Sequence, residues 1–112
     1  MHRLGIAVIC VLVLWFLFRP FKVTVYRFHR PSCPYCVRSQ SEWNKYEFYC
    51  LFSTTRTVNV NLDEPQGARM AKLFGVKTVP TVIAVTADGY VEQYDGERTA
   101  SGYCDWVCDI TA

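Results

Sequence analysis

Two cysteines separated by two residues stand directly after a strand-like segment. Residues 22–28 alternate well enough between apolar and polar side chains to form a strand, and they are followed by Cys33, Pro34, Tyr35 and Cys36. Pro34 suits the first position of a helix, because its missing N–H would have no partner there. Such a helix points free N–H groups at Cys33 and favours its thiolate form. The pair therefore predicts a redox-active dithiol, with Cys36 close enough to attack a mixed disulfide on Cys33.

A zinc site and a pair of inert structural thiols are the alternatives for this pair of cysteines. A zinc site needs further ligands, normally a second C-x-x-C pair or two suitably spaced histidines. The sequence has no second pair of this kind, and His2 and His29 are its only histidines. They are not spaced as a ligand pair, so we expect redox chemistry and no metal at Cys33 and Cys36.

The N-terminus differs in composition from the rest of the chain. Residues 4–18 hold no charged or strongly polar side chain, and Arg3 and Arg19 flank them. A signal peptide would need small residues before a cleavage site, and a core helix would need a polar face. The remaining interpretation is a single transmembrane helix, with residues 1–21 as the anchor. Fifteen residues span only about 22 Å of a hydrocarbon core of roughly 30 Å, a difference that snorkelling arginines and local thinning would absorb.

Residues 22–112 are long enough for one domain, and the order of predicted elements is β-α-β-α-β-β-α. The chain's net charge of +2 gives no reason to expect nucleic acid binding. More positive charges follow the apolar segment than precede it, so the positive-inside rule places the domain on the cytosolic side. Strands are expected at 22–28, 57–62, 81–85 and 90–94, and helices at 34–49, 63–74 and 101–110.

The connections between these elements predict the sheet. The first two strands are joined through a helix and should be parallel, whereas the last two form an antiparallel hairpin. The fold class is therefore α/β, with a four-stranded mixed sheet flanked by helices and preceded by one transmembrane helix. Trp43 and Tyr46 share a helix face with Cys36 and Cys50. We interpret both aromatic residues as core rather than as a substrate platform.

Three segments carry a resemblance to known proteins. Cys-Pro-Tyr-Cys at 33–36 is the active-site sequence typical of glutaredoxins. Residues 78–80, Thr-Val-Pro, resemble the segment that holds a cis-proline facing the dithiol in the thioredoxin superfamily. Residues 94–99 resemble a Tyr-x-Gly-x-Arg segment of disulfide isomerase domains. On these residues, 22–112 resembles the thioredoxin superfamily and is glutaredoxin-like.

The resemblance implies a thioredoxin/glutaredoxin-like fold and a thiol–disulfide oxidoreductase, with Cys33 as nucleophile and Cys36 as resolving cysteine. The expected substrate is a protein disulfide or a glutathione mixed disulfide, glutathione is a candidate reductant, and no cofactor is required. The backbone of Val79 is expected to bind an extended substrate, and Arg30 stands where glutaredoxins often carry a lysine for the glutathione carboxylate. The residues that the resemblance assigns to substrate binding are Arg30, Pro34, Tyr35, Thr78, Val79 and Pro80.

The chain departs from the family pattern at several positions. Arg27 sits where thioredoxins place a buried acid, and Ser32 replaces the tryptophan that usually precedes the first cysteine. The Gly-Gly-x-Asp segment of many glutathione sites is not evident, which favours a protein disulfide as the partner. We expect His29 and Arg30 to lower the pKa of Cys33 through nearby positive charge where they are protonated.

Four cysteines lie outside the motif. Cys10 lies in the apolar segment, and we interpret it as a small apolar residue that fills space there. Cys50 could form a structural disulfide with Cys104 or Cys108, the three could be free thiols of a reducing compartment, or they could share a zinc ion. The sequence leaves these alternatives open.

A second function from another class also remains open. A small anchored domain of this kind could serve as a scaffold for protein contacts within a larger membrane-associated assembly, such as a membrane-containing virion. In that case the dithiol would be a relic or would help the assembly to mature. Activity that depends on Cys33 separates the two hypotheses.

Overall fold

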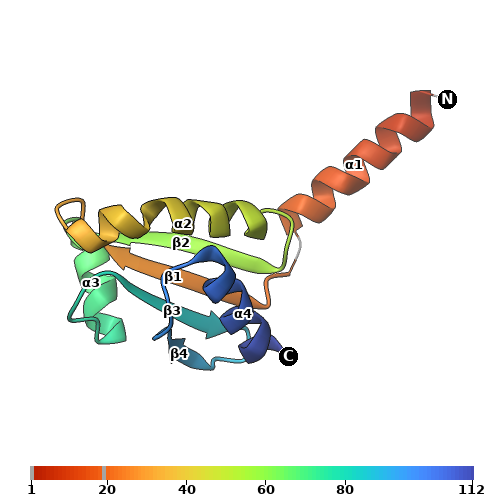
Figure 1. The fold of residues 1–112 in the computed structure, drawn as a ribbon. Helices are drawn as coiled ribbons and strands as arrows, with labels where there is room; N and C mark the ends of the chain where they lie inside the picture. The colour runs from red at the N-terminus through yellow and green to blue at the C-terminus, as the bar shows by residue number, and fades with distance from the viewer. Residues whose placement is uncertain (1, 19) are drawn as a thin grey trace.

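The computed structural model describes residues 2–18 and 20–112, and every predicted strand and helix of the domain is present (Figure 1). The elements are α1 (His2–Phe18), β1 (Val23–His29), α2 (Pro34–Cys50), β2 (Thr55–Asn61), α3 (Pro65–Phe74), β3 (Thr81–Thr86), β4 (Val91–Gln93) and α4 (Ala100–Thr111).

The strands form one mixed sheet in the order β2-β1-β3-β4. β1 pairs in parallel with β2, with Val25 opposite Thr57, and antiparallel with β3, with Val25 opposite Ala84. β3 and β4 form the antiparallel hairpin. The predicted four-stranded mixed sheet is confirmed, and its central strand β1 is the one that leads into the cysteine pair.

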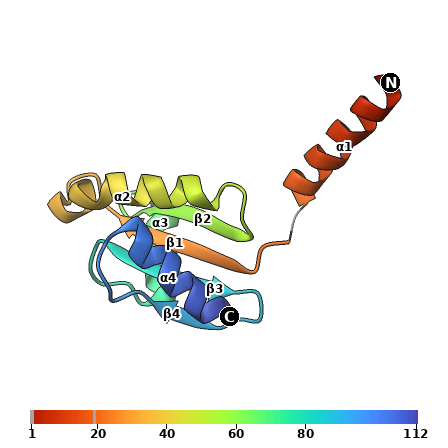
Figure 2. The ribbon, with the colours of Figure 1, turned by 45° about the vertical axis from the view of Figure 1, so that its right-hand side comes forward.

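Helices cover both faces of the sheet, with α2 and α4 on one face and α3 on the other (Figures 1 and 2). Val25 of β1 packs beneath α2 and α4, together with Trp43, Tyr46 and Tyr103. Phe28 packs on the opposite side of the same strand, beneath α3. Because neighbouring residues of a strand point to opposite faces, β1 contributes to both halves of the core. Trp43 and Tyr46 are fully buried, as their interpretation as core residues requires.

Two elements begin two residues away from the predicted start, because of contacts that the local pattern does not reveal, and the other boundaries agree to within one residue. β2 begins at Thr55, two residues earlier than expected, since Thr55 pairs with Val23 of β1. α3 begins at Pro65, and the preceding turn is closed by the backbone N–H of Asp63, which donates to Asn61 Oδ1 at 2.9 Å. The helix ends at Gly75, as predicted, in the left-handed conformation with φ 70°.

The predicted N-terminal helix is present as α1, but the predicted membrane crossing is not found. α1 contains 17 residues. In residues 2–18 and 20–112, no helix combines the length and the apolar character that a transmembrane span requires. At 1.5 Å per residue, α1 is about 26 Å long, shorter than a hydrocarbon core of roughly 30 Å. Both views show α1 extending away from the domain (Figures 1 and 2).

Candidate active site

Cys33 occupies the residue immediately before α2, and its sulfur caps the helix. The backbone N–H of Cys36 donates to Cys33 Sγ at 3.2 Å. Pro34 takes the first helical position, as predicted. The sulfur thus replaces the oxygen that usually caps a helix, and it lies at the positive end of the helix dipole.

The environment of Cys33 favours its thiolate. Burial raises the pKa of the thiol, but hydrogen bonds from the Cys36 thiol and from the N–H groups of Cys36 and Tyr35 lower it. The positive charge of Arg27 lowers it as well, and the net pKa lies below the ordinary value for a cysteine. Cys33 is half-exposed, so a nucleophile prepared in this way is within reach of a substrate.

Cys36 lies one helical turn further along and differs from Cys33 in both exposure and acidity. Its side chain is buried. Burial raises the pKa of the Cys36 thiol, and the hydrogen bond with Cys33 raises it further. The pair therefore consists of an accessible, acidic thiol and a buried, protonated one. A nucleophile and a resolving cysteine need this asymmetry.

Residues 78–80 lie beside Cys33, next to the start of β3. The peptide bond between Val79 and Pro80 is cis. In its thiol form, Cys33 Sγ donates to the carbonyl oxygen of Val79 at 3.7 Å. The Thr81 hydroxyl donates to the carbonyl oxygen of Thr78 at 2.6 Å, which ties this segment to β3. The fold thus brings the predicted substrate-binding segment to the predicted nucleophile.

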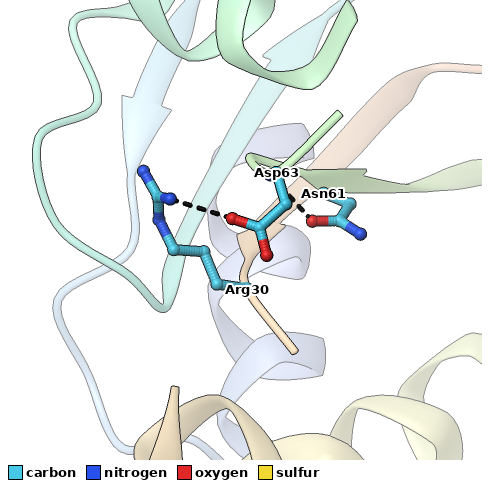
Figure 3. Close-up of polar contacts among 3 residues, drawn as sticks. All are labelled: Arg30, Asn61 and Asp63. Atoms are coloured by element: carbon cyan, nitrogen blue, oxygen red, sulfur yellow. Dashed lines mark hydrogen bonds and ion pairs between the residues drawn. The ribbon is translucent and has the colours of Figure 1, made fainter. Parts of the chain in front are cut away.

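The charge that acts on Cys33 is not the one that the sequence suggested. Arg30 Nη1 forms an ion pair with Asp63 Oδ1 at 2.9 Å, on the turn that follows β2 (Figure 3). Burial lowers the pKa of His29, and the Arg27 charge lowers it further, so His29 is neutral at pH 7. His29 thus lacks the charge on which that prediction depends, the charge of Arg30 is paired with Asp63, and the cation that lowers the pKa of Cys33 is Arg27.

Tyr35 presents its ring to solvent beside the dithiol. The guanidinium of Arg38 lies 5.4 Å from the ring centroid, and that of Arg98 lies 5.8 Å away. Exposed cation–π contacts of this kind contribute about 0.5–1 kcal/mol each. Arg98 belongs to the segment 94–99 noted in the sequence, and the fold places its side chain beside Tyr35 in the first turn of α2.

Arg27 lies beside the cysteine pair, although sequence reasoning did not assign it to the site. It lies on β1, on the same face of the strand as Val23 and Val25, and is 1% exposed. The sequence did contain a sign that Arg27 is special, because a charged residue at an inward-facing position of a central strand is unusual. The motif alone could not show that its side chain reaches the first turn of α2.

Among the described residues, the other cysteines form no disulfide. Cys50, Cys104 and Cys108 line one surface pocket of about 280 Å³ between the end of α2 and α4. All three are free thiols. Burial raises the pKa values of Cys50 and Cys104, which makes both poorer nucleophiles than Cys33. Within the described residues, no group of three or more histidine, cysteine or acidic side chains is arranged to hold a metal ion.

Comparison with solved structures shows which fold this arrangement belongs to, although no protein-family model matches the chain. The J-Trx1 fragment of ERdj5 superposes with a TM-score of 0.71 at 16% identity, over 80% of this chain and 43% of that one. The first thioredoxin domain of mouse protein disulfide-isomerase A4 gives a TM-score of 0.69 at 19% identity, over 81% and 64%. A mutant thioredoxin from Halobacterium salinarum gives 0.66 at 21% identity, over 82% and 77%.

The chain thus spans less than two thirds of the first two of these structures. At these identities the comparison concerns the fold alone. It agrees with the mixed sheet and the flanking helices. The protein has a thioredoxin-like α/β fold.

Proposed function

We propose that the protein is a thiol–disulfide oxidoreductase in which Cys33 is the nucleophile and Cys36 resolves. The observation that carries the proposal is the unequal pair at the start of α2. Cys33 is half-exposed and has a lowered pKa, whereas Cys36 is buried and has a raised pKa. The fold of disulfide isomerase and thioredoxin domains supports the same chemistry.

The reaction follows from this geometry. The Cys33 thiolate attacks one sulfur of a substrate disulfide, forms a mixed disulfide and releases the other substrate sulfur as a thiolate. Cys36 then loses its proton and attacks Cys33 Sγ, which forms the Cys33–Cys36 disulfide and releases the second substrate thiol. Two electrons and the Cys36 proton have then moved from the protein to the substrate, and the remaining substrate thiolate takes from water the proton that Cys33 gave up when it ionised. Run backwards, the same steps transfer the disulfide to a dithiol substrate.

Substrate binding is proposed at the residues around Cys33. Thr78 is exposed, Val79 and Pro80 are half-buried, and the segment lies against the Cys33 sulfur, where an extended peptide could align with it. Pro34 and Tyr35 offer an exposed surface on the other side of that sulfur. Because Arg30 is paired with Asp63, a carboxylate of glutathione would have to displace Asp63. We therefore propose protein disulfides as the main substrates and glutathione as a reductant.

Substitution of each cysteine tests the proposed roles. In an insulin-reduction assay, Cys33→Ser should reduce the rate by at least about 100-fold, since no other thiol in the site can begin the exchange. Cys36→Ser should retain attack but lose resolution, so mixed disulfides with substrate proteins should accumulate and be isolable. Cys108→Ser, at an exposed thiol outside the site, is the matched control and should keep full activity.

Equal rates for the unsubstituted protein and Cys33→Ser would contradict the enzyme proposal and favour the scaffold alternative. In that case, capture of partner proteins should not depend on Cys33. Trapping with Cys36→Ser also identifies the physiological substrates, because each is held through a covalent bond.

We further propose that α1 holds the domain at a lipid surface. Its apolar side chains are at least half exposed at each of these positions: Ile6, Val8, Ile9, Val11, Leu12, Val13, Leu14 and Trp15. An apolar surface of this length is costly in water, at about 25 cal/mol per Å². Arg3 and Arg19 flank the apolar stretch in the sequence, as expected for a helix that meets phospholipid headgroups.

A further inference from the structure

The Arg27 side chain lies beneath the cysteine pair and is bound to the first turns of α2. Its Nη2 donates to the carbonyl oxygen of Cys36 at 2.7 Å and to Ser39 Oγ at 3.2 Å. Its Nη1 donates to Gln40 Oε1 at 2.9 Å. The guanidinium carbon is also 6.0 Å from the centroid of the Trp43 ring. These contacts fix the cation at the buried side of the helix that carries Cys33 and Cys36.

The acceptors in these hydrogen bonds are all neutral. Within the described parts of the chain, the ion pairs are Arg30 with Asp63 and Lys45 with Glu42, and neither includes Arg27. The titratable groups whose charges act on Arg27 are Cys36, Tyr103, Glu47 and Cys33. Glu47 is half-buried and accepts a hydrogen bond from the Asn59 amide at 3.1 Å. Arg27 is thus a buried cation without a carboxylate at ion-pair distance.

A guanidinium stays protonated in proteins, so Arg27 carries its charge in both redox states of the neighbouring cysteines. Burying a charge without a partner is unfavourable by several kcal/mol, and a nearby anion reduces that penalty. The disulfide state of Cys33 and Cys36 is neutral and supplies no anion. The reduced state supplies one, the thiolate of Cys33.

We propose that Arg27 stabilises the Cys33 thiolate and thereby shifts the Cys33–Cys36 couple toward its reduced form. The disulfide form is then a stronger oxidant than the same couple without the cation, which favours donation of a disulfide to a dithiol substrate. Arg27 is a positioning residue in this proposal, because it acts through Cys33 and touches no substrate. The inference rests on the proposed function of the dithiol.

The redox equilibrium with glutathione measures this effect directly. The protein disulfide takes two electrons and two protons from two glutathione thiols, which gives the dithiol and one glutathione disulfide. The fraction reduced can be read by alkylation and mass spectrometry of the tryptic peptide 28–38, which holds Cys33 and Cys36 and no other cysteine. In a variant that lacks Arg27 the corresponding peptide is 23–38.

Two substitutions remove the effect of the charge in different ways. Arg27→Met deletes the cation, whereas Gln40→Glu keeps the hydrogen bond to Arg27 Nη1 and neutralises the cation with a carboxylate of the same shape. Each should lower the equilibrium constant for reduction by about tenfold, or roughly 30 mV for a two-electron couple. Each should also raise the pH at which Cys33 becomes a thiolate by about one unit.

Asn44→Asp is the matched control, because it adds a carboxylate one turn further along α2 at an exposed position. Asn44→Asp should change the equilibrium constant by less than about twofold from that of the unsubstituted protein. Arg27→Lys keeps a positive charge at position 27, so its equilibrium constant should lie closer to that of the unsubstituted protein than to that of Arg27→Met. If Arg27→Met does not fold, Gln40→Glu alone decides. The inference is overturned if Gln40→Glu and a folded Arg27→Met keep the unsubstituted constant. Failure of the proposed function is a separate result, the absence of insulin reduction that depends on Cys33.

Discussion

At the scale of single residues, two cysteines of the same chemical type have opposite properties three positions apart. Cys33 accepts hydrogen bonds from backbone N–H groups at the start of α2, and the side chain of Cys36, in the first turn of that helix, is buried. The lowered and raised pKa values follow from these positions and not from the residue type. Arg27 adds the third element, a fixed charge on the buried side of the pair.

The lowered pKa of Cys33 predicts its reactivity as a function of pH. A thiol with a lowered pKa keeps its thiolate as the pH falls below the ordinary range, so alkylation of Cys33 by iodoacetamide should continue at pH values where a free cysteine, with a pKa of about 8.5, has become unreactive. Cys50, whose pKa is raised by burial, should need a higher pH.

Mass spectrometry of peptides 28–38 and 46–56 follows the two residues in one sample. A midpoint for Cys33 at or above that of free cysteine would contradict the assignment of the nucleophile. Because Cys36 shares its peptide with Cys33, the measurement is made on Cys36→Ser.

At the scale of elements, α2 and α3 are positioned by different local interactions. α2 begins at a proline capped by a sulfur, which places the dithiol at its positive end. α3 lies so close to the end of β2 that only glycine fits at position 67, where an added Cβ would stand 1.8 Å from the carbonyl oxygen of Asn61. The same end of β2 leads to Asp63, which pairs with Arg30.

Gly67→Ala separates this packing effect from helix propensity. Alanine in place of glycine inside a helix normally stabilises by about 1 kcal/mol. Here the methyl group would overlap a backbone atom that cannot rotate away, so the free energy of unfolding should fall by about 1–3 kcal/mol. Urea denaturation followed by circular dichroism measures the change.

The exposed neighbour Gln66 gives the control for this substitution, and Gln66→Ala should change the free energy of unfolding by less than about 0.5 kcal/mol. An unchanged or increased stability of Gly67→Ala would show that α3 can move away from β2.

At the scale of the whole molecule, the dithiol and α1 lie at opposite ends of β1. α1 precedes the first residue of this strand and Cys33 follows its last, so the seven residues of β1 separate them by about 20 Å (Figure 1). If α1 lies in a lipid surface, the dithiol points away from that surface. Substrates would then reach Cys33 from the water.

Protection of cysteines by vesicles tests this arrangement. With anionic phospholipid vesicles, labelling of Cys10 in α1 by a membrane-impermeant maleimide should fall at least about fivefold, because lipid covers the apolar helix. Labelling of Cys33 should not change. The tryptic peptides 4–22 and 28–38 report the two sites separately.

A change in α1 should abolish the protection of Cys10, and a matched change elsewhere should not. Ile9→Asp together with Val13→Asp places two charges on the apolar helix, and Leu73→Asp places one at an exposed leucine of α3. Equal labelling of Cys10 with and without vesicles would refute the lipid proposal and leave the redox proposal intact.

Features that depend only on neighbours along the chain could be predicted from the sequence. Alternation in residues 22–28, the proline at 34 and the glycine at 75 predicted a strand, a helix start and a helix stop at the observed places. The spacing of Cys33 and Cys36 predicted a redox-active dithiol. Each of these signals is local, because it depends on backbone geometry within a few residues.

Which charges act on the dithiol depends on how β1 packs against α2 and could not be predicted from local patterns. His29 and Arg30 are nearer to Cys33 in sequence, yet Arg30 pairs with Asp63 at the end of the neighbouring strand β2 and His29 is neutral. Arg27 is further away in sequence but points beneath α2, because odd-numbered residues of β1 face that helix. Electrostatic effects depend on distance and burial in space, and the alternation of a strand decides which side chain is buried under the site.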